Sequence, residues 1–254
     1  FIEIERMLQL DNRILYFYRT VYIFICHHFI QVDTRGMYQL LLFHILGTVC
    51  IEVYLCLLVI QTGEGMLVLW TALKSTLKPG DRVLVLSTGL FGEGFGDMAK
   101  ALGCEIRVLD FGYDETIHDF DVVEKAIVEF KPKMITMVQN ETPSGTTNPV
   151  KEIGDLKVKY GVPLLCVDIV SGLGGTPIHV DDWHVDFALG GSQKCLSAPA
   201  NMSFLSVSEE AWKIVEEVSY AGYEALLPFR NVTETGYFPY TPYWQGTAQL
   251  HKAC

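Results

Sequence analysis

The sequence predicts an α/β fold, a mostly parallel β-sheet with helices on both faces. From residue 61 onward, short apolar runs rich in Val, Ile and Leu alternate with amphipathic segments. Gly, Pro or a capping residue separates most of these segments. Strand–helix–strand alternation is typical of parallel strands joined by helical crossovers. The 254 residues suffice for one large domain or two small ones of this class.

Start and stop signals justify the elements in chain order. The first helix ends before Pro79, and the second closes on Gly103. The third opens at an Asp cap, either Asp119 or Asp121, and Pro132 follows its end. The predicted helices are residues 66–77, 95–103, 118–132 and 149–161. The predicted strands are residues 81–89, 104–111, 133–140, 162–170, 185–191 and 202–208.

Residues 1–60 differ from the rest of the chain. They contain no Pro and no Lys, and their aromatic-rich runs have neither a clean helical nor a clean strand period. Met37 to Ile60 is long and apolar enough for a transmembrane helix, but Glu52 would be costly in lipid. We therefore do not expect a membrane partner. A buried helix, or sequence foreign to the domain, are the alternatives for this segment.

Composition argues against several kinds of site. The formal net charge is −11 and no basic stripe occurs, which argues against nucleic acid as a partner. The seven cysteines form no Cys-x-x-Cys pair, and no metal site is predicted. Neither the dinucleotide nor the P-loop glycine motif occurs. The odd number of cysteines indicates reduced thiols in an intracellular protein, with peroxisome, mitochondrion and cytoplasm left open.

Residues able to do chemistry directly follow the predicted strands, where ligands bind in parallel α/β sheets. They are Ser87, Thr88, Asn140, Glu141, Thr142, Ser144, Asp168, Ser192, Gln193 and Lys194. A lysine amine can form a Schiff base with an aldehyde, and an acid can keep a pyridine nitrogen protonated. Hydroxyls and helix N-terminal amides can bind phosphate. This set suits a cofactor with an aldehyde, a pyridine ring and a phosphate.

Each of these residues alone has a simpler explanation. Lys194 alone would be surface charge, and Asp168 alone a helix cap. Thr142 and Ser144 could be turn residues beside a proline, and Phe91 could belong to the core. Joint placement at the ends of predicted strands favours a binding site instead.

The string VDIVSGLGGTPIHVDDWHVDFALGGSQKCLSAPANMSFLSVS resembles the lysine region of class V aminotransferases, which use pyridoxal 5'-phosphate (PLP). It is most similar to the alanine–glyoxylate, serine–pyruvate and serine–glyoxylate group. An acid ends a strand, a turn of small residues follows, and then a Ser-Gln-Lys-x-Leu motif. The resemblance implies that Lys194 forms the Schiff base with PLP and that Asp168 faces the pyridine nitrogen. It also implies that Gln193 contacts the phosphate or the ring.

Further motifs extend the resemblance from Thr62 to Thr247 in the family's order. TGLFGEGFGDMAKALG resembles the turn whose aromatic side chain stacks on the cofactor ring, which implies that role for Phe91. NETPSGTTNPV resembles a loop in which Thr142 would hydrogen-bond near the ring oxygen or the phosphate. YFPYTP resembles a segment that reaches the neighbouring subunit's phosphate, which implies a homodimer and roles for Tyr240 and Thr241.

The phosphate-binding turn departs from the family's pattern. The family has Ser-Gly-x-Gly-Thr or Ser-Gly-His before the first large helix. This chain has Thr62, then Gly63, Glu64, Gly65 and Met66. The two glycines can still offer amides to a cofactor phosphate, but Glu64 would place a carboxylate beside it. Cofactor binding should therefore be weaker unless Glu64 turns away.

The resemblance also implies how the chain is divided. Residues 1–60 would be an atypical segment unlike the family's N-terminal arm, 61–247 the PLP-binding large domain of fold type I, and 248–254 the truncated start of a small C-terminal domain, otherwise absent. That domain supplies the arginine that grips the substrate carboxylate. Neither Arg82, Arg107 nor Arg230 matches its motif.

The expected function is that of a PLP-dependent transaminase. An amino group would pass from a small amino acid, alanine or serine, to a 2-oxo acid, glyoxylate or pyruvate. Two alternatives stay open. One is a catalytically incomplete fragment or pseudoenzyme of the same family. The other is a different class V reaction, such as aminophosphonate transamination.

Overall fold

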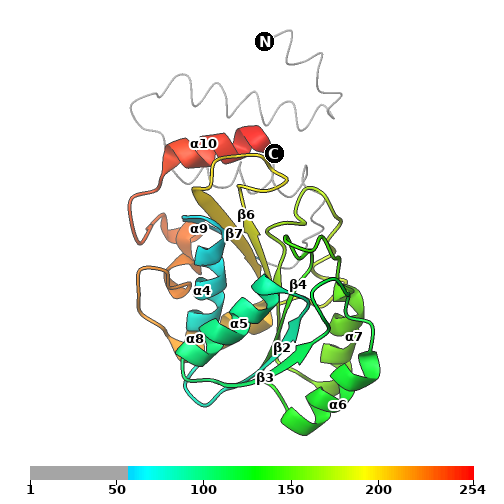
Figure 1. Ribbon diagram of the computed structural model, residues 1–254. Coiled ribbons are helices and arrows are strands. Elements are labelled where there is room, and N and C mark those ends of the chain that lie inside the picture. Colours follow the sequence, from blue (N-terminus) through cyan, green and yellow to red (C-terminus); the bar gives the residue numbers. More distant parts are fainter. Residues whose placement is uncertain (1–56) are drawn as a thin grey trace, which may run out of the picture. The chain divides into compact units, whose positions relative to one another are not determined.

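The computed structural model describes residues 57–254, which contain a seven-stranded sheet covered by helices (Figure 1). The strands are β1 Leu57–Thr62, β2 Arg82–Ser87, β3 Glu105–Asp110, β4 Met134–Val138, β5 Leu164–Asp168, β6 Phe187–Gly191 and β7 Met202–Val207. Their order in the sheet is β1-β7-β6-β5-β4-β2-β3. The neighbours from β6 to β3 are parallel, whereas β7 is antiparallel to both β6 and β1. The mostly parallel sheet predicted from the sequence is confirmed.

The helices pack against both faces of the sheet. They are α4 Gly65–Thr76, α5 Leu90–Ala101, α6 Phe120–Phe130, α7 Val150–Tyr160, α8 Glu209–Val218, the 3-10 turn η1 Leu227–Phe229, α9 Val232–Thr235 and α10 Trp244–Ala253. Helices α4, α5 and α8 share one face, and α6 and α7 pack on the other (Figure 1). The right-handed crossovers expected for parallel strands account for this two-sided cover.

Alternate residues of the central strands pack against helices to form the core. Val83 and Val85 of β2 and Cys166 of β5 belong to one buried cluster with Phe95 of α5 and Trp212 of α8. Strands buried on both faces are continuous apolar runs rather than alternating ones, because helices cover both sides. The five residues of β4 and the five of β5 are all buried.

The predicted start is confirmed for α6 and needs correction for α5. Asp119 caps α6, since its side chain accepts a hydrogen bond from the Val122 amide at 3.0 Å. Helix α5 begins at Leu90, so Phe91 lies in its first turn rather than in the preceding loop. The reason is a distant acid. Glu141 accepts hydrogen bonds from the first amides of α5 and extends the helix toward the strand.

Two predicted boundaries fall inside elements. Strand β1 begins at Leu57, so the sheet includes four residues that precede the boundary expected at residue 61. The same four residues end the apolar stretch considered as a membrane span, and the rest of that stretch lies outside the described residues. Across residues 57–254, no helix has the length and apolarity to cross a membrane. The boundary expected at residue 248 falls within α10.

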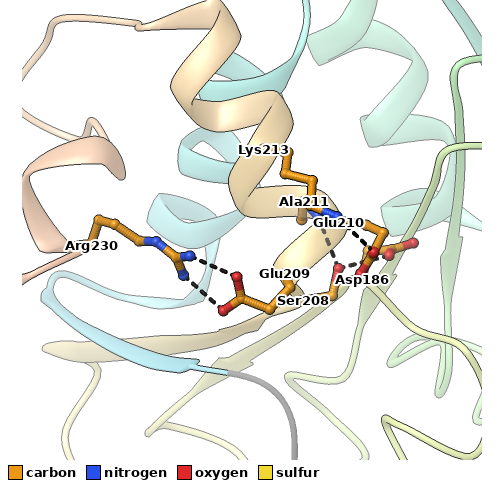
Figure 2. Close-up of polar contacts among 7 residues, drawn as sticks. All are labelled: Asp186, Ser208, Glu209, Glu210, Ala211, Lys213 and Arg230. Atoms are coloured by element: carbon orange, nitrogen blue, oxygen red, sulfur yellow. Dashed lines mark hydrogen bonds and ion pairs between the residues drawn. The ribbon is translucent and has the colours of Figure 1, made fainter.

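A polar network joins the start of α8 to the sheet (Figure 2). Ser208 caps α8 by accepting from the Ala211 amide at 3.0 Å, and its hydroxyl donates to Asp186 at 2.8 Å. Arg230 donates through two nitrogens to both carboxylate oxygens of Glu209, at 2.9 and 2.6 Å. These contacts hold α8 in place, and α8 packs against α4. The start of α4 forms part of the site described next.

Candidate active site

A cavity of about 260 Å³ lies at the carboxyl ends of β4, β5 and β6. Its volume is just below the roughly 300 Å³ at which pockets for drug-sized ligands begin, so it suits a small molecule. The N-cap and first turns of α4 and the first turn of α5 complete its wall. The lining residues are Glu64, Gly65, Met66, Leu69, Phe91, Val138, Asn140, Thr142, Asp168, Val170, Ser171, Gln193 and Lys194.

Lys194 and Asp168 line the same cavity. Asp168 is the last residue of β5, and Lys194 follows the neighbouring strand β6 by three residues. The loop carrying Lys194 is tied back to the sheet, because the Ser192 hydroxyl donates to the Pro199 carbonyl at 2.5 Å. The Met202 amide at the start of β7 donates to the same hydroxyl at 3.3 Å. The amine and the acid therefore lie at one edge of the sheet.

Asp168 is a buried carboxyl group with a perturbed titration. Burial raises its pKa from 3.8 to about 7, and the negative charges of Glu141 and Glu64 add to this effect. The Val170 amide, which donates to Asp168 Oδ1 at 2.7 Å, and the charge of Lys194 act in the opposite direction. A cationic ring nitrogen beside this group would favour its ionised form.

Phe91 is positioned by an acid that comes from a different strand. The amides of Phe91 and Gly92 donate to the two carboxylate oxygens of Glu141 at 2.9 and 3.2 Å. Glu141 follows β4 and is buried, with 1% of its surface exposed. A carboxylate at a helix N-terminus satisfies free amides and complements the helix dipole. Glu141 therefore holds the start of α5 so that the Phe91 ring lines the cavity.

Hydroxyl and amide groups form the wall between β4 and β5. Thr142 and Ser171 share a hydrogen bond through their hydroxyls. Among the described residues, the buried side-chain oxygens that have no hydrogen-bond partner include Asn140 Oδ1 and Gln193 Oε1. Both residues line the cavity. Buried polar atoms are normally satisfied, so these oxygens are candidates for contact with a bound molecule or water.

Glu64 does not turn away from the cavity. It is the N-cap of α4, and its Oε2 accepts a hydrogen bond from the Met66 amide at 3.0 Å. Gln193 Nε2 donates to the same oxygen at 3.4 Å. The carboxylate therefore lies at the end of α4 where a helix would otherwise bind an external anion.

Some residues named from the sequence do not line this cavity. Among those expected to touch the cofactor, they are Gly63, Tyr240 and Thr241, and among the other polar residues after strands they are Ser87, Thr88, Glu141, Ser144 and Ser192. The Gly63 amide donates to the Asn201 carbonyl at 2.9 Å, so this amide is already engaged. The Tyr240 ring stacks on Tyr223 with centroids 4.8 Å apart. Thr241 is exposed beyond it.

The three arginines considered as a substrate clamp also lie elsewhere. Arg230 pairs with Glu209, and Arg107 pairs with Glu129 at 3.1 Å. Arg82 is the first residue of β2, at the opposite end of that strand from Phe91. None of the three is among the residues that line the cavity.

A larger hollow of about 810 Å³ lies at the other end of the sheet. Its wall includes Arg82 and Glu105, the first residues of their strands, and Lys133, which precedes β4. Lys133 is paired with Asp81 at 2.7 Å. Ligands of parallel α/β sheets bind beyond the carboxyl ends, so the smaller cavity is the better candidate.

Sequence reasoning did not assign roles to Glu141, Val170 or Ser171. Glu141 was noted after its strand, but its contact with α5 joins residues 50 positions apart. No local pattern indicates such a contact. The Val170 amide donates to Asp168, and the Ser171 hydroxyl shares a hydrogen bond with Thr142. Both contacts depend on the conformation of the loop after β5, which the sequence does not specify.

The profile of the family described as aminotransferase class V matches residues 56–235. An uncharacterized aminotransferase of Methanocaldococcus jannaschii is 37% identical over 196 residues, which are 76% of this chain and 50% of that protein. Serine–glyoxylate aminotransferase of Methylorubrum extorquens is 34% identical over 194 residues, covering 71% of this chain and 47% of the relative. The crystal structure of pyridoxamine–pyruvate aminotransferase from Mesorhizobium loti has a TM-score of 0.78 at 29% identity, covering 86% of this chain and 56% of that one.

The chain belongs to the class V aminotransferase family. Its sheet and helices have the fold of PLP-dependent aminotransferases, as the sequence predicted. The chain spans about half the length of the curated relatives described above.

Proposed function

We propose that the protein is a PLP-dependent transaminase that transfers an amino group from alanine or serine to glyoxylate or pyruvate. The observation that carries this proposal is the meeting of Lys194 and Asp168 in one small cavity at the carboxyl edge of the sheet. Membership of the class V family supports it, as does the serine–glyoxylate relative. In this reaction the donor becomes a 2-oxo acid and the acceptor becomes an amino acid.

The residues present fit the ring of PLP. Bound PLP supplies an aldehyde that condenses with amines and a ring that accepts electrons. We assign Lys194 Nζ to the aldehyde, and afterwards to moving the proton at the substrate carbon. Asp168 would hold the ring nitrogen by charge, with its Oδ1 kept in place by the Val170 amide. Phe91 would cover one face of the ring, and Thr142 would bind near its oxygen.

The phosphate would lie toward the start of α4. Gly65 and Gln193 line that end of the cavity and are assigned to it, together with the loop at Gly63. Glu64 lies there too, and its carboxylate opposes a phosphate. The ring end of the site thus fits PLP better than the phosphate end.

We further propose that the functional unit is a homodimer with amino acid and 2-oxo acid substrates. Tyr240 and Thr241 do not line their own chain's cavity, which is compatible with a role in a neighbouring subunit's site. Tyr237 and Trp244 beside them are 68% and 59% exposed. The molar mass in solution tests this part of the proposal, and the mass of a single chain would contradict it. The division at residues 61 and 248 also remains a proposal.

The assignment of Lys194 is tested by spectroscopy of the purified chain with added PLP. We expect Lys194→Ala to lose the visible absorbance that PLP gains when a lysine amine binds its aldehyde. Lys213→Ala, at an exposed lysine of α8, should retain it. A Lys194→Ala variant with an unchanged band would show that the assignment is wrong. Binding without turnover of an amine donor would favour the catalytically incomplete alternative.

A second candidate function is favoured by Glu64. One protein of similar structure is the pyridoxamine–pyruvate aminotransferase described above. Pyridoxamine has the ring of PLP but carries no phosphate. If pyridoxamine were the amino donor to pyruvate, Glu64 would face a neutral substituent instead of a phosphate.

A further inference from the structure

The start of α4 already holds a negative charge. Glu64 Oε2 accepts hydrogen bonds from the Met66 amide and from Gln193 Nε2. One oxygen therefore contacts a donor in α4 and a donor in the loop after β6. Helix α4 has 12 residues, and its N-terminus favours an anion through its free amides and its dipole. The carboxylate supplies that anion from within the chain.

The backbone next to Glu64 is closely packed against the sheet. A Cβ atom added at Gly65 would lie 2.8 Å from Val170 Cγ2. One added at Gly191 would lie 2.6 Å from Gln193 Oε1 and 3.1 Å from the Gly65 Cα. The start of α4 is therefore packed directly against the ends of β5 and β6. Rotating the Glu64 side chain out of the cavity would break its hydrogen bonds with the Met66 amide and Gln193, and α4 would lose its N-cap.

The charges lining the cavity do not compensate for Glu64. Among the described residues that line it, Lys194 is the one cation, and Glu64 and Asp168 are acids. Lys194 is assigned to the aldehyde end. A bound phosphate would thus meet a carboxylate near α4 without an arginine or lysine beside it. Repulsion between two like unit charges in a partly buried site lowers the affinity for the charged ligand by about tenfold or more.

We propose that Glu64 is a specificity-determining residue that removes the site's preference for a phosphorylated ligand, so that the non-phosphorylated aldehyde pyridoxal or the corresponding amine binds about as well as PLP. This inference rests on the proposed function, because Lys194, Asp168 and Phe91 must hold the ring. It deepens that function by assigning the ligand class to a single side chain. One half of the cavity selects the ring, and the other half gives a phosphate no advantage.

The experiment measures dissociation constants of PLP and pyridoxal for the full chain by spectroscopic titration. In the native protein the two constants should lie within about tenfold of each other. Glu64→Ser keeps a side chain that caps helices but removes the charge. This variant should bind PLP about tenfold more tightly or better, with little change for pyridoxal.

Glu64→Asp is the matched control, because it keeps both the charge and the capping ability. Its ratio of dissociation constants should stay near that of the native protein. Thermal unfolding of all three proteins without ligand establishes that each is folded. A Glu64→Ser ratio equal to the native ratio, or equal shifts in the Ser and Asp variants, would overturn the inference.

Failure of the proposed function looks different. Neither ligand would then bind to any of the three proteins, or both would bind without a contribution from Lys194. If instead the native protein bound PLP far more tightly than pyridoxal, the Lys194 assignment would stand and only the role of Glu64 would be rejected.

Discussion

The carboxyl group of Asp168 couples the stability of the folded protein to pH. Its pKa of about 7 in the folded protein lies above the ordinary value of 3.8, chiefly because the group is buried. The folded protein therefore holds this proton more tightly than the unfolded chain does. The stabilisation is fully present below the ordinary pKa and is lost as pH rises through about 7.

Asp168→Asn should remove this dependence, because an amide does not ionise and can still accept from the Val170 amide. As pH rises, the native protein should lose unfolding free energy that the variant retains, so the variant should become more stable relative to the native protein. Between about pH 5 and about pH 8 the change should be on the order of 2 kcal/mol. Urea unfolding without cofactor measures it. A difference that is constant with pH would mean that Asp168 titrates normally.

At the residue scale, the sequence predicted where Lys194 and Asp168 lie but not the residues that support them. Lys194 and Asp168 were identifiable because each follows or ends an apolar run, and the ends of parallel strands meet at one edge. Glu64 was identified as a departure from a motif, yet its orientation required the structure. Its hydrogen bond from Gln193 joins residues 129 positions apart, which no local spacing specifies.

At the element scale, a residue that follows β4 positions the start of α5, the helix that follows β2. Glu141 follows β4, while the amides it accepts from belong to Phe91 and Gly92 after β2. Gly89 allows the close approach, since an added Cβ would lie 2.8 Å from Glu141 Cγ. The helix therefore begins earlier than its own sequence predicts.

Glu141→Ala should destabilise the protein by about 2 kcal/mol, because two amides of a helix N-terminus would lose their buried acceptor. Glu141→Gln should cost less, since its carbonyl oxygen can still accept one bond. Chemical unfolding of both variants measures the effect. Glu93→Ala, at an exposed acid of the same helix turn, is the control and should change stability little. An alanine variant as stable as the native protein would argue against this anchoring role.

At the scale of the whole molecule, the alternation of strands and helices predicted a mostly parallel sheet but not the edge strand β1. Strand β1 was not predicted, because Leu57–Thr62 continues an apolar stretch that has no turn signal before it. It pairs antiparallel with β7, in a register that sets Leu58 opposite Ser206, although most of the described chain separates the two strands. Such non-local pairing is specified by tertiary packing rather than by local propensity.

The same scale includes a buried carboxylate, that of Asp186, which ties both helical layers to the sheet. Asp186 Oδ2 accepts from the Leu165 amide at 2.7 Å and pairs with Lys157 of α7 at 2.9 Å. Its Oδ1 accepts from Ser208, which caps α8 on the opposite face. Burial raises the pKa of Asp186 even though Lys157 opposes the shift, so the ion pair does not fully offset desolvation.

Asp186→Ala should therefore destabilise the protein by about 3 kcal/mol, because it leaves the half-buried ammonium of Lys157 without its acidic partner and removes the acceptor of Leu165 and Ser208. Lys157→Met should cost less, since Asp186 keeps its two other donors and the methionine fills the space of the lysine stem. In the double variant the unpaired lysine is gone, so the combined loss should be smaller than the sum by on the order of 2 kcal/mol. Equilibrium unfolding of the four proteins in this cycle measures the coupling. Strictly additive losses would mean that the ion pair contributes nothing beyond the separate contacts of its two members, and that Asp186 ties the layers to the sheet through Leu165 and Ser208 rather than through Lys157.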